Sequence, residues 1–307
     1  MHSGAGHVRN RALAAAGLLL AIAAVVLVQL LSDGRAGAAS ATAAKGKTTV
    51  VSKTFRLTQA NETPRLEVLC PRGRFPYGGG MTSSPPPGSD GEGVYPHSYE
   101  RLGVQGGWHV TPVLYDPSPG STQPRSVTLQ VVCGPEPGKL TPPHVTVQVN
   151  PGETKTLVMK CPGRRQLIGG GFNRTDFINR GGDFVTESQA ITSKAWRVTG
   201  QAFGGFGGEL TGIAYCRRSR KPLLKEVTAS TAIPAGAVGT ATTPRCRGGR
   251  RLVFGGFGSG PTGSLFIADG TINGNQSWTA SAYNRSNAPA NLTAYGYCMT
   301  VKPVLES

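Results

Sequence analysis

Apolar and polar residues alternate with a period of two along most of the chain after residue 47, as expected for strands with one buried face. The clearest runs end at a cysteine that shares a face with small or apolar residues. These runs are Val127, Leu129, Val131 and Cys133; Leu210, Gly212, Ala214 and Cys216; and Leu292, Ala294, Gly296 and Cys298. No helical period competes, and 44 glycines and 23 prolines disfavour long helices. The pattern predicts an all-β fold.

The expected strands belong to one pattern that occurs three times, with five or six strands in each copy. Each copy opens at a cysteine, passes through a glycine run and one tryptophan, and closes at a second cysteine. We expect the repeats to span residues 48–134, 144–218 and 224–301, and the first, divergent repeat to carry a long loop at 82–93. Such repeats form either a pseudo-threefold, β-prism-like body with one core or three small β modules in tandem.

Local features add detail to this pattern. The glycine runs at 78–80 and 169–171 lie equally far from their cysteines, and Phe254 replaces the first glycine of the third run. Glycine inside a strand marks a bulge, a bend or a close contact, so we expect Trp108, Trp196 and Trp278 to pack over these strands in the core. Residues 145–149 and 154–161 flank a turn at 150–153 and predict a hairpin.

The six cysteines predict three disulfides, because the chain has the features of an exported protein. Only one pairing repeats identically: Cys70–Cys133, Cys161–Cys216 and Cys246–Cys298. No two cysteines have the short spacing of a zinc knuckle, so a zinc site is disfavoured.

The first segment is typical of an export signal. Arg9 and Arg11 precede the apolar run 12–31, and small-residue cleavage patterns follow up to residue 41. The apolar run is longer than the usual signal core and long enough to span a bilayer. Residues 1–41 are therefore expected to be a signal peptide or an N-terminal membrane anchor. The rest of the protein is expected to be extracellular, either secreted or anchored to the outer face of the cytoplasmic membrane.

The repeat resembles a known type. Its motifs resemble a repeat of exported, mostly uncharacterised proteins of high-GC actinobacteria. These motifs are Cys-Pro-x-Gly-x4-Gly-Gly-Gly, Trp-x-Val/Ala-x and Leu-Thr-x-x-x-Tyr-Cys. The match covers the second and third repeats well and the first partly, since that repeat ends Val-Val-Cys. The resemblance implies export and one disulfide per repeat, and it implies no activity. The threefold repetition is similar, by analogy only, to the β-prism of vitelline membrane outer layer protein and some lectins.

Charge is the main clue to a partner. The net charge is +16, and removing residues 1–41, with three arginines and one aspartate, leaves +14. Such a surface attracts polyanions, although a solvated basic face is the plainer interpretation. The candidate polyanion contacts are Arg217, Arg218, Arg220, Lys221, Arg250 and Arg251. Tyr283, Tyr295 and Tyr297 are expected to face away from the core, where they could stack on bases, but no specific nucleic-acid binding is expected.

Catalytic and metal-binding signals are weak. His97, His109 and His144 are scattered and are expected to be ordinary surface or turn residues, and no facing pair of carboxylates is evident. We therefore assign no catalytic, cofactor or metal residues. We expect an exported, non-enzymatic cell-surface or extracellular protein with a structural, adhesive or envelope-polymer-binding role. Its partner would be an anionic cell-envelope polymer or a carbohydrate. The alternatives are a secreted hydrolase with a cryptic site in repeat one and a lectin-like carbohydrate-binding protein.

Overall fold

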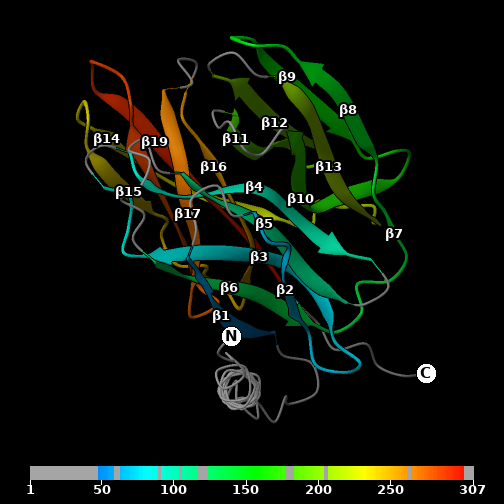
Figure 1. Ribbon diagram of the computed structural model, residues 1–307. Helices are drawn as coiled ribbons and strands as arrows, with labels where there is room; N and C mark the ends of the chain where they lie inside the picture. Colours follow the sequence, from blue (N-terminus) through cyan, green and yellow to red (C-terminus); the bar gives the residue numbers. More distant parts are fainter. Residues whose placement is uncertain are drawn as a thin grey trace, which may run out of the picture. The chain divides into compact units, whose positions relative to one another are not determined.

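The computed structural model describes residues 48–58, 63–88, 91–103, 106–115, 124–176, 183–203, 207–260 and 264–300. These residues form nineteen strands (Figure 1). The expected all-β class is confirmed. Among the described residues no helix is long and apolar enough to cross a membrane. The expected signal or anchor at 1–41, with its apolar run 12–31, lies outside the described residues.

The strands follow the three repeats. The first repeat has β1 (Thr49–Leu57), β2 (Leu66–Leu69), β3 (Phe75–Ser84), β4 (Gly93–Leu102), β5 (Gly107–Tyr115) and β6 (Arg125–Gly134). The second has β7 (Leu140–Thr141), β8 (His144–Val149), β9 (Thr154–Lys160), β10 (Arg165–Asp176), β11 (Asp183–Thr192), β12 (Ala195–Ala202) and β13 (Gly208–Arg218). The third has β14 (Lys225–Ile233), β15 (Val238–Thr242), β16 (Arg251–Gly258), β17 (Leu265–Asn273), β18 (Ser277–Asn284) and β19 (Ala290–Met299). The two-residue β7 lies between the expected bounds of the first two repeats, in residues 135–143, where no strand was expected.

Each of the three antiparallel sheets is assembled from two repeats. Sheet A has the order β1-β6-β3-β17-β18-β15, sheet B has β2-β5-β4-β10-β13-β7 with β8 also paired to β13, and sheet C has β14-β19-β16-β11-β12-β9. Every repeat therefore gives strands to two sheets, and the cycle closes after the third repeat. One hydrophobic cluster contains buried residues from all three repeats. The protein is thus a pseudo-threefold body with a shared core, and not three separate modules.

The expected hairpin at residues 145–161 is wrong. The turn is present, since the Glu153 N–H donates to the Asn150 carbonyl at 2.9 Å and Gly152 has a φ of +76°. However, β8 pairs with β13 in sheet B, whereas β9 pairs with β12 in sheet C. The turn is the corner where the chain leaves one sheet for the next. Alternation cannot distinguish the two cases, because both have strands with a period of two.

The glycine runs make room for the tryptophans and for neighbouring backbone. A Cβ atom on the middle glycines Gly79, Gly170 and Gly255 would lie 2.2, 2.2 and 1.9 Å from the rings of Trp108, Trp196 and Trp278. These tryptophans are 0, 0 and 2% exposed. A Cβ atom on the third glycines Gly80, Gly171 and Gly256 would lie 2.2, 2.3 and 2.5 Å from a carbonyl oxygen of the adjoining repeat. The expected packing of tryptophan over glycine is confirmed.

The first position of the glycine run breaks the symmetry. Here Gly78 and Gly169 face the ring of Phe254, and a Cβ atom on Gly78 would lie 2.1 Å from that ring. Phe254 also meets Trp108 and Trp196 edge-on, with ring centroids 5.6 and 5.2 Å apart. One ring from one repeat therefore fills the space where three equivalent positions converge. Equivalent rings also meet at a second place, where Tyr95, Phe184 and Phe266 have centroids 3.9 to 5.9 Å apart.

The three expected disulfides are confirmed. Cys70–Cys133, Cys161–Cys216 and Cys246–Cys298 each join Cα atoms 5.6 Å apart. Each bridge lies within its repeat and links the segment before the glycine strand to the closing strand. Three such bonds indicate an oxidising, extracellular environment.

The loop expected at 82–93 is shorter in the structure, because β3 continues to Ser84 and β4 begins at Gly93. Arg125, which is only 4% exposed, donates to the carbonyls of Pro85 and Pro86 at 2.8 and 2.9 Å and forms a 2.9 Å ion pair with Glu92. The loop is therefore attached to its own repeat by a buried charge.

Candidate functional site

Each sheet carries a carboxylate on its outer face, close to the boundary between two repeats. The strands β4, β11 and β17 pair across this boundary, and each has a β-bulge near the crossing. Glu187 and Asp269 directly follow their bulges, whereas Glu100 lies two residues beyond Ser98, the equivalent position of β4. Bulges redirect side chains and are common next to functional sites.

In sheet B, Glu100 connects the two repeats. Its Oε1 lies 2.9 Å from Nδ1 of His109 and accepts a hydrogen bond from Asn173 Nδ2 at 3.2 Å. His109 Nε2 lies 3.0 Å from Thr111 Oγ1. His109 and His97 are 4 and 5% exposed, so the expectation of surface histidines is wrong for both, while His144 is exposed. The expectation failed for His109 because Glu100 and Thr111 hold its ring against the sheet.

In sheets C and A the carboxylates are bound mainly by hydroxyls, amides or a guanidinium. Glu187 accepts from Arg197 Nη2 at 2.5 Å, from Thr199 Oγ1 at 2.9 Å and from Gln189 Nε2. Asp269 accepts from the N–H and hydroxyl of Ser83 and from the hydroxyl of Ser281, at 2.8, 3.2 and 3.0 Å. Burial raises the pKa of Asp269 to about 6, against the lowering effect of these hydrogen bonds.

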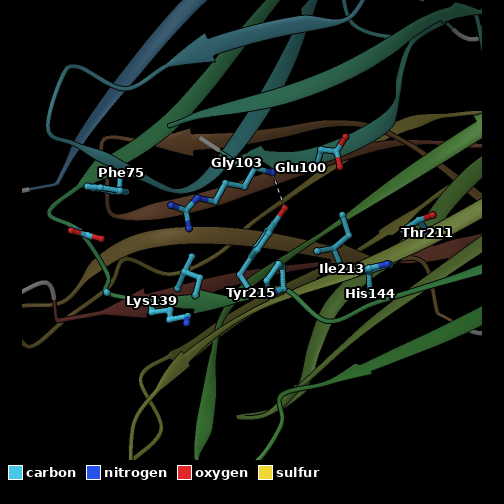
Figure 2. Close-up of a pocket in the computed structure, with 13 residues that line it drawn as sticks. Phe75, Glu100, Gly103, Lys139, His144, Thr211, Ile213 and Tyr215 are labelled. Atoms are coloured by element: carbon cyan, nitrogen blue, oxygen red, sulfur yellow. Dashed lines mark hydrogen bonds between the residues drawn. The ribbon is translucent and has the colours of Figure 1, made fainter. Parts of the chain in front are cut away.

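A groove lies on sheet B, where the first repeat, residues 135–143 and the second repeat meet. The sheet B groove has a volume of about 590 Å³. Its apolar lining is Phe75, Leu140, Pro142, Ile213 and the ring of Tyr215, and its charged or titratable lining is Glu100, Arg101, Glu136, Lys139 and His144. Figure 2 shows Tyr215 in the middle, between Phe75 on one side and Ile213 and His144 on the other. Because both repeats contribute, the groove is not confined to repeat one.

Tyr215 links the two repeats within this groove. Its hydroxyl accepts the main-chain N–H of Arg101 at 2.7 Å, the dashed line of Figure 2. Burial raises the pKa of Tyr215 and lowers the pKa of the Arg101 guanidinium. The short strand β7 pairs with Cys216 and Arg217 and places Leu140 at the edge of the groove. No sequence signal marked this strand.

A second, basic pocket lies beside the disulfide of the second repeat. The basic pocket has a volume of about 500 Å³ and is lined by Arg164, Gln166, Lys194, Ser219 and Arg220. The Ser219 N–H donates to the Arg164 carbonyl at 3.0 Å, and Lys194 Nζ donates to the Gly163 carbonyl at 3.1 Å. Gln166 is 5% exposed, and its Oε1 has no hydrogen-bond partner among the described residues.

The six residues expected to contact a polyanion lie at the end of β13, in the segment that follows it, and at or just before the start of β16. Arg217 and Arg218 are successive residues of β13, so their side chains leave opposite faces of the strand. Arg251 starts β16 in sheet C, opposite Met299. Of the six, only Arg220 lines the basic pocket. The polyanion contact stays a prediction.

Sequence reasoning missed two residues of the basic pocket, Arg164 and Lys194. Arg164 stands three residues after Cys161, and Lys194 lies in the turn between β11 and β12. Neither is among the six residues expected to contact a polyanion. The pairing of β10 with β13 brings Arg164 close to Arg220. Lys194 joins them because its carbonyl accepts the Cys161 N–H and its Nζ donates to the Gly163 carbonyl.

Of the three tyrosines expected on outward strand faces, two are buried and are not available to stack on bases. Tyr297 is 1% exposed and Tyr283 is 8% exposed, while Tyr295 is half-buried. The Tyr297 hydroxyl accepts the Ala190 N–H at 2.7 Å, the same role that Tyr215 has in sheet B. The residue before the closing cysteine is therefore covered by the adjoining repeat, although it lies on the outer face of its strand.

Within the described ranges, no group of three or more His, Cys, Asp or Glu residues is placed to hold a metal ion. No protein-family model matches the chain, and no curated protein matches it in sequence.

Proposed function

We propose that this is an exported, non-enzymatic protein of the cell surface that binds an anionic envelope polymer through the basic pocket. One observation carries the proposal. Arg164, Lys194 and Arg220 come from three separate segments and converge around Ser219, and no acid is among the five lining residues described. This convergence is not expected of cations that serve only to solvate a surface, since like charges repel at close range.

The chemistry of the pocket suits phosphate or carboxylate groups. Arginine presents a planar fork of donors that matches both anions, and lysine adds a compact charge. The net charge of +14 outside residues 1–41 draws polyanions towards the protein. The cations are exposed, so each contact is weak and screened by salt. A polymer that presents many anions compensates by repeated engagement.

The recurrence of the carboxylate networks supports a non-enzymatic role. Thr199 binds Glu187 in sheet C, Ser281 binds Asp269 in sheet A, and Glu100 reaches Thr111 through His109 in sheet B. A hydroxyl linked to a carboxylate thus occurs on every sheet, although Glu100 lies two residues beyond Ser98, the position equivalent to Glu187. In all three sheets the network braces neighbouring strands, which is a structural role.

The test is retention on purified cell walls and on an anionic resin against a salt gradient. The variant Arg164→Gln/Lys194→Gln/Arg220→Gln should elute at clearly lower salt than the wild type. The matched control, Arg218→Gln/Lys221→Gln/Arg251→Gln, removes the same charge from exposed residues outside the basic pocket. Equal losses in both variants would show that net charge, and not the pocket, governs retention. Retention that resists 1 M salt would contradict the proposal as a whole.

A second candidate function is a secreted glycoside hydrolase that acts in the sheet B groove. The observation in its favour is that two carboxylates, Glu100 and Glu136, line the same groove. Glycosidases use such a pair. Release of reducing ends from cell-wall polysaccharide, lost in both Glu100→Gln and Glu136→Gln, would establish this function. A wild-type protein that releases no reducing ends would rule out this function.

A further inference from the structure

The outer face of sheet C holds a third groove, which follows the boundary between the second and third repeats. The sheet C groove has a volume of about 400 Å³. Most of its lining residues carry hydroxyls, an amide or a charge. Among them are Thr156, Glu187, Gln189, Arg197, Thr199 and Tyr295. The groove is therefore polar, in contrast to the largely apolar sheet B groove.

Gly258 opens the floor of this groove. It pairs with Glu187 on one side and with Thr293 on the other. A Cβ atom on Gly258 would meet Tyr295, Gln189 and Glu187 at ordinary contact distances of 3.5, 3.6 and 3.7 Å. Packing therefore does not demand glycine here, unlike the glycines under the tryptophans. The absent side chain leaves a space beside Glu187.

The other two sheets fill the equivalent place. Asn173 in sheet B pairs with Thr211, and Thr82 in sheet A pairs with Thr128, as Gly258 pairs with Thr293. The side chain of Asn173 reaches across the boundary to Glu100. In sheet C the hydrogen bonds to Glu187 come from Arg197, Thr199 and Gln189, which lie on β11 and β12. Only sheet C thus leaves its carboxylate next to an open floor.

The groups around this floor are held in fixed positions. Glu187 is 17% exposed and is oriented by its ion pair with Arg197, whose side chain is 36% exposed. Thr156 and Thr199 lie 3.0 Å apart, so a row of hydroxyls leads from β9 to the carboxylate. Tyr295 supplies a half-buried ring beside the floor. The groove therefore combines a hydrogen-bonding carboxylate, a guanidinium, hydroxyls and one aromatic face.

We propose that the sheet C groove binds a neutral saccharide unit. A sugar ring presents adjacent hydroxyls that bond to carboxylates, guanidinium groups and threonines, and an apolar face that packs on an aromatic ring. An anionic ligand fits less well, because Glu187 lines the groove and both Glu187 and Glu226 are close enough to act on Tyr295. An apolar ligand would leave the polar lining desolvated. This site is independent of the basic pocket, which it shares no residue with.

The experiment is a titration of the full protein with fragments of neutral glucan, mannan and galactan, followed by calorimetry and by NMR. We expect one fragment class to saturate the wild type in the millimolar range. Gly258→Thr inserts the residue that sheet A has at this place, and it should weaken that binding at least tenfold. The matched control is Gly103→Thr, which adds the same side chain at an open glycine of the sheet B groove and should leave binding unchanged.

The outcomes separate this site from the others. The proposal is overturned if no fragment saturates the wild type, if Gly258→Thr binds as the wild type does, or if Gly103→Thr is the variant that loses binding. Should Gly258→Thr fail to fold, Tyr295→Gln replaces it, because sheet A carries Gln130 at that register. Tyr295→Gln should also bind the fragment at least tenfold more weakly than the wild type. Retention on anionic resin should be unchanged in all these variants, so failure here leaves the basic pocket unaffected.

Discussion

The inner and outer faces of the three sheets follow different rules. On the inner face the repeats agree closely: each has a tryptophan over a glycine and a buried closing cysteine. On the outer face, equivalent positions carry Ile213, Gln130 and Tyr295, or Asn173, Thr82 and Gly258. The difference indicates that the inner face specifies the fold and that the outer face is free to specify ligands.

The largest loss of stability is expected when a tryptophan of the inner face is removed. Trp196→Ala should lower the free energy of unfolding by about 3–5 kcal/mol, because a fully buried ring is lost from above Gly170 and the core closes over the space only in part. Denaturant unfolding measures the change. A variant with an unchanged melting temperature but altered ligand binding would make the ring a site residue instead.

Removal of a disulfide should cause the next largest loss of stability. Replacing Cys161 and Cys216 together by Ala removes a bridge across 55 residues and should cost about 2–5 kcal/mol. Non-reducing peptide mapping of the wild type provides the accompanying check on connectivity. A recovered Cys133–Cys161 peptide would be incompatible with the structure described.

The stability of the folded protein should depend on pH through Asp269. Its pKa is raised to about 6 by burial, above its ordinary value near 3.8, so the folded state holds the proton more tightly than the unfolded state. The stabilisation is complete below about pH 4 and is lost as the pH rises through 6. From the shift in pKa, the free energy of unfolding should fall by up to about 3 kcal/mol over this range.

The control for this pH dependence is Asp269→Asn, which keeps the shape of the side chain and removes its titration. Its profile of unfolding free energy against pH should lose the fall between pH 4 and 6. An identical profile in wild type and variant would assign the effect to another group.

The smallest effect should come from the outer hydroxyl pairs. Thr146 and Thr211 lie 2.8 Å apart on exposed positions, as do Thr54 and Thr128, and Ser230 and Thr293. Thr146→Val should change stability by no more than about 1 kcal/mol, because such cross-strand pairs contribute little and solvent replaces the lost bond. A larger loss, measured by thermal unfolding, would show that the outer face also helps to specify the fold.

The features that the repeat and the alternation of apolar residues record directly could be predicted from the sequence. The repetition predicted the disulfides, and the alternation before Cys133, Cys216 and Cys298 predicted the buried side of the closing strands. What failed depends on neighbours distant in sequence. Tyr297 is buried because the second repeat covers it, and β8 and β9 separate because each finds a different sheet. The basic pocket needed Lys194, whose place beside Arg220 follows only from the fold.

The sharing of every sheet between two repeats also limits how this protein can evolve and be engineered. In sheet A, β3 of the first repeat meets β17 of the third, so the ends of the repeat array close on each other. A solenoid gains or loses copies at its ends, whereas this closed ring has no end at which to add one. Deleting one copy would expose unpaired edges in both remaining partners, and such edges invite aggregation. The number of copies is therefore fixed at three, and variation is confined to the surface that each copy presents.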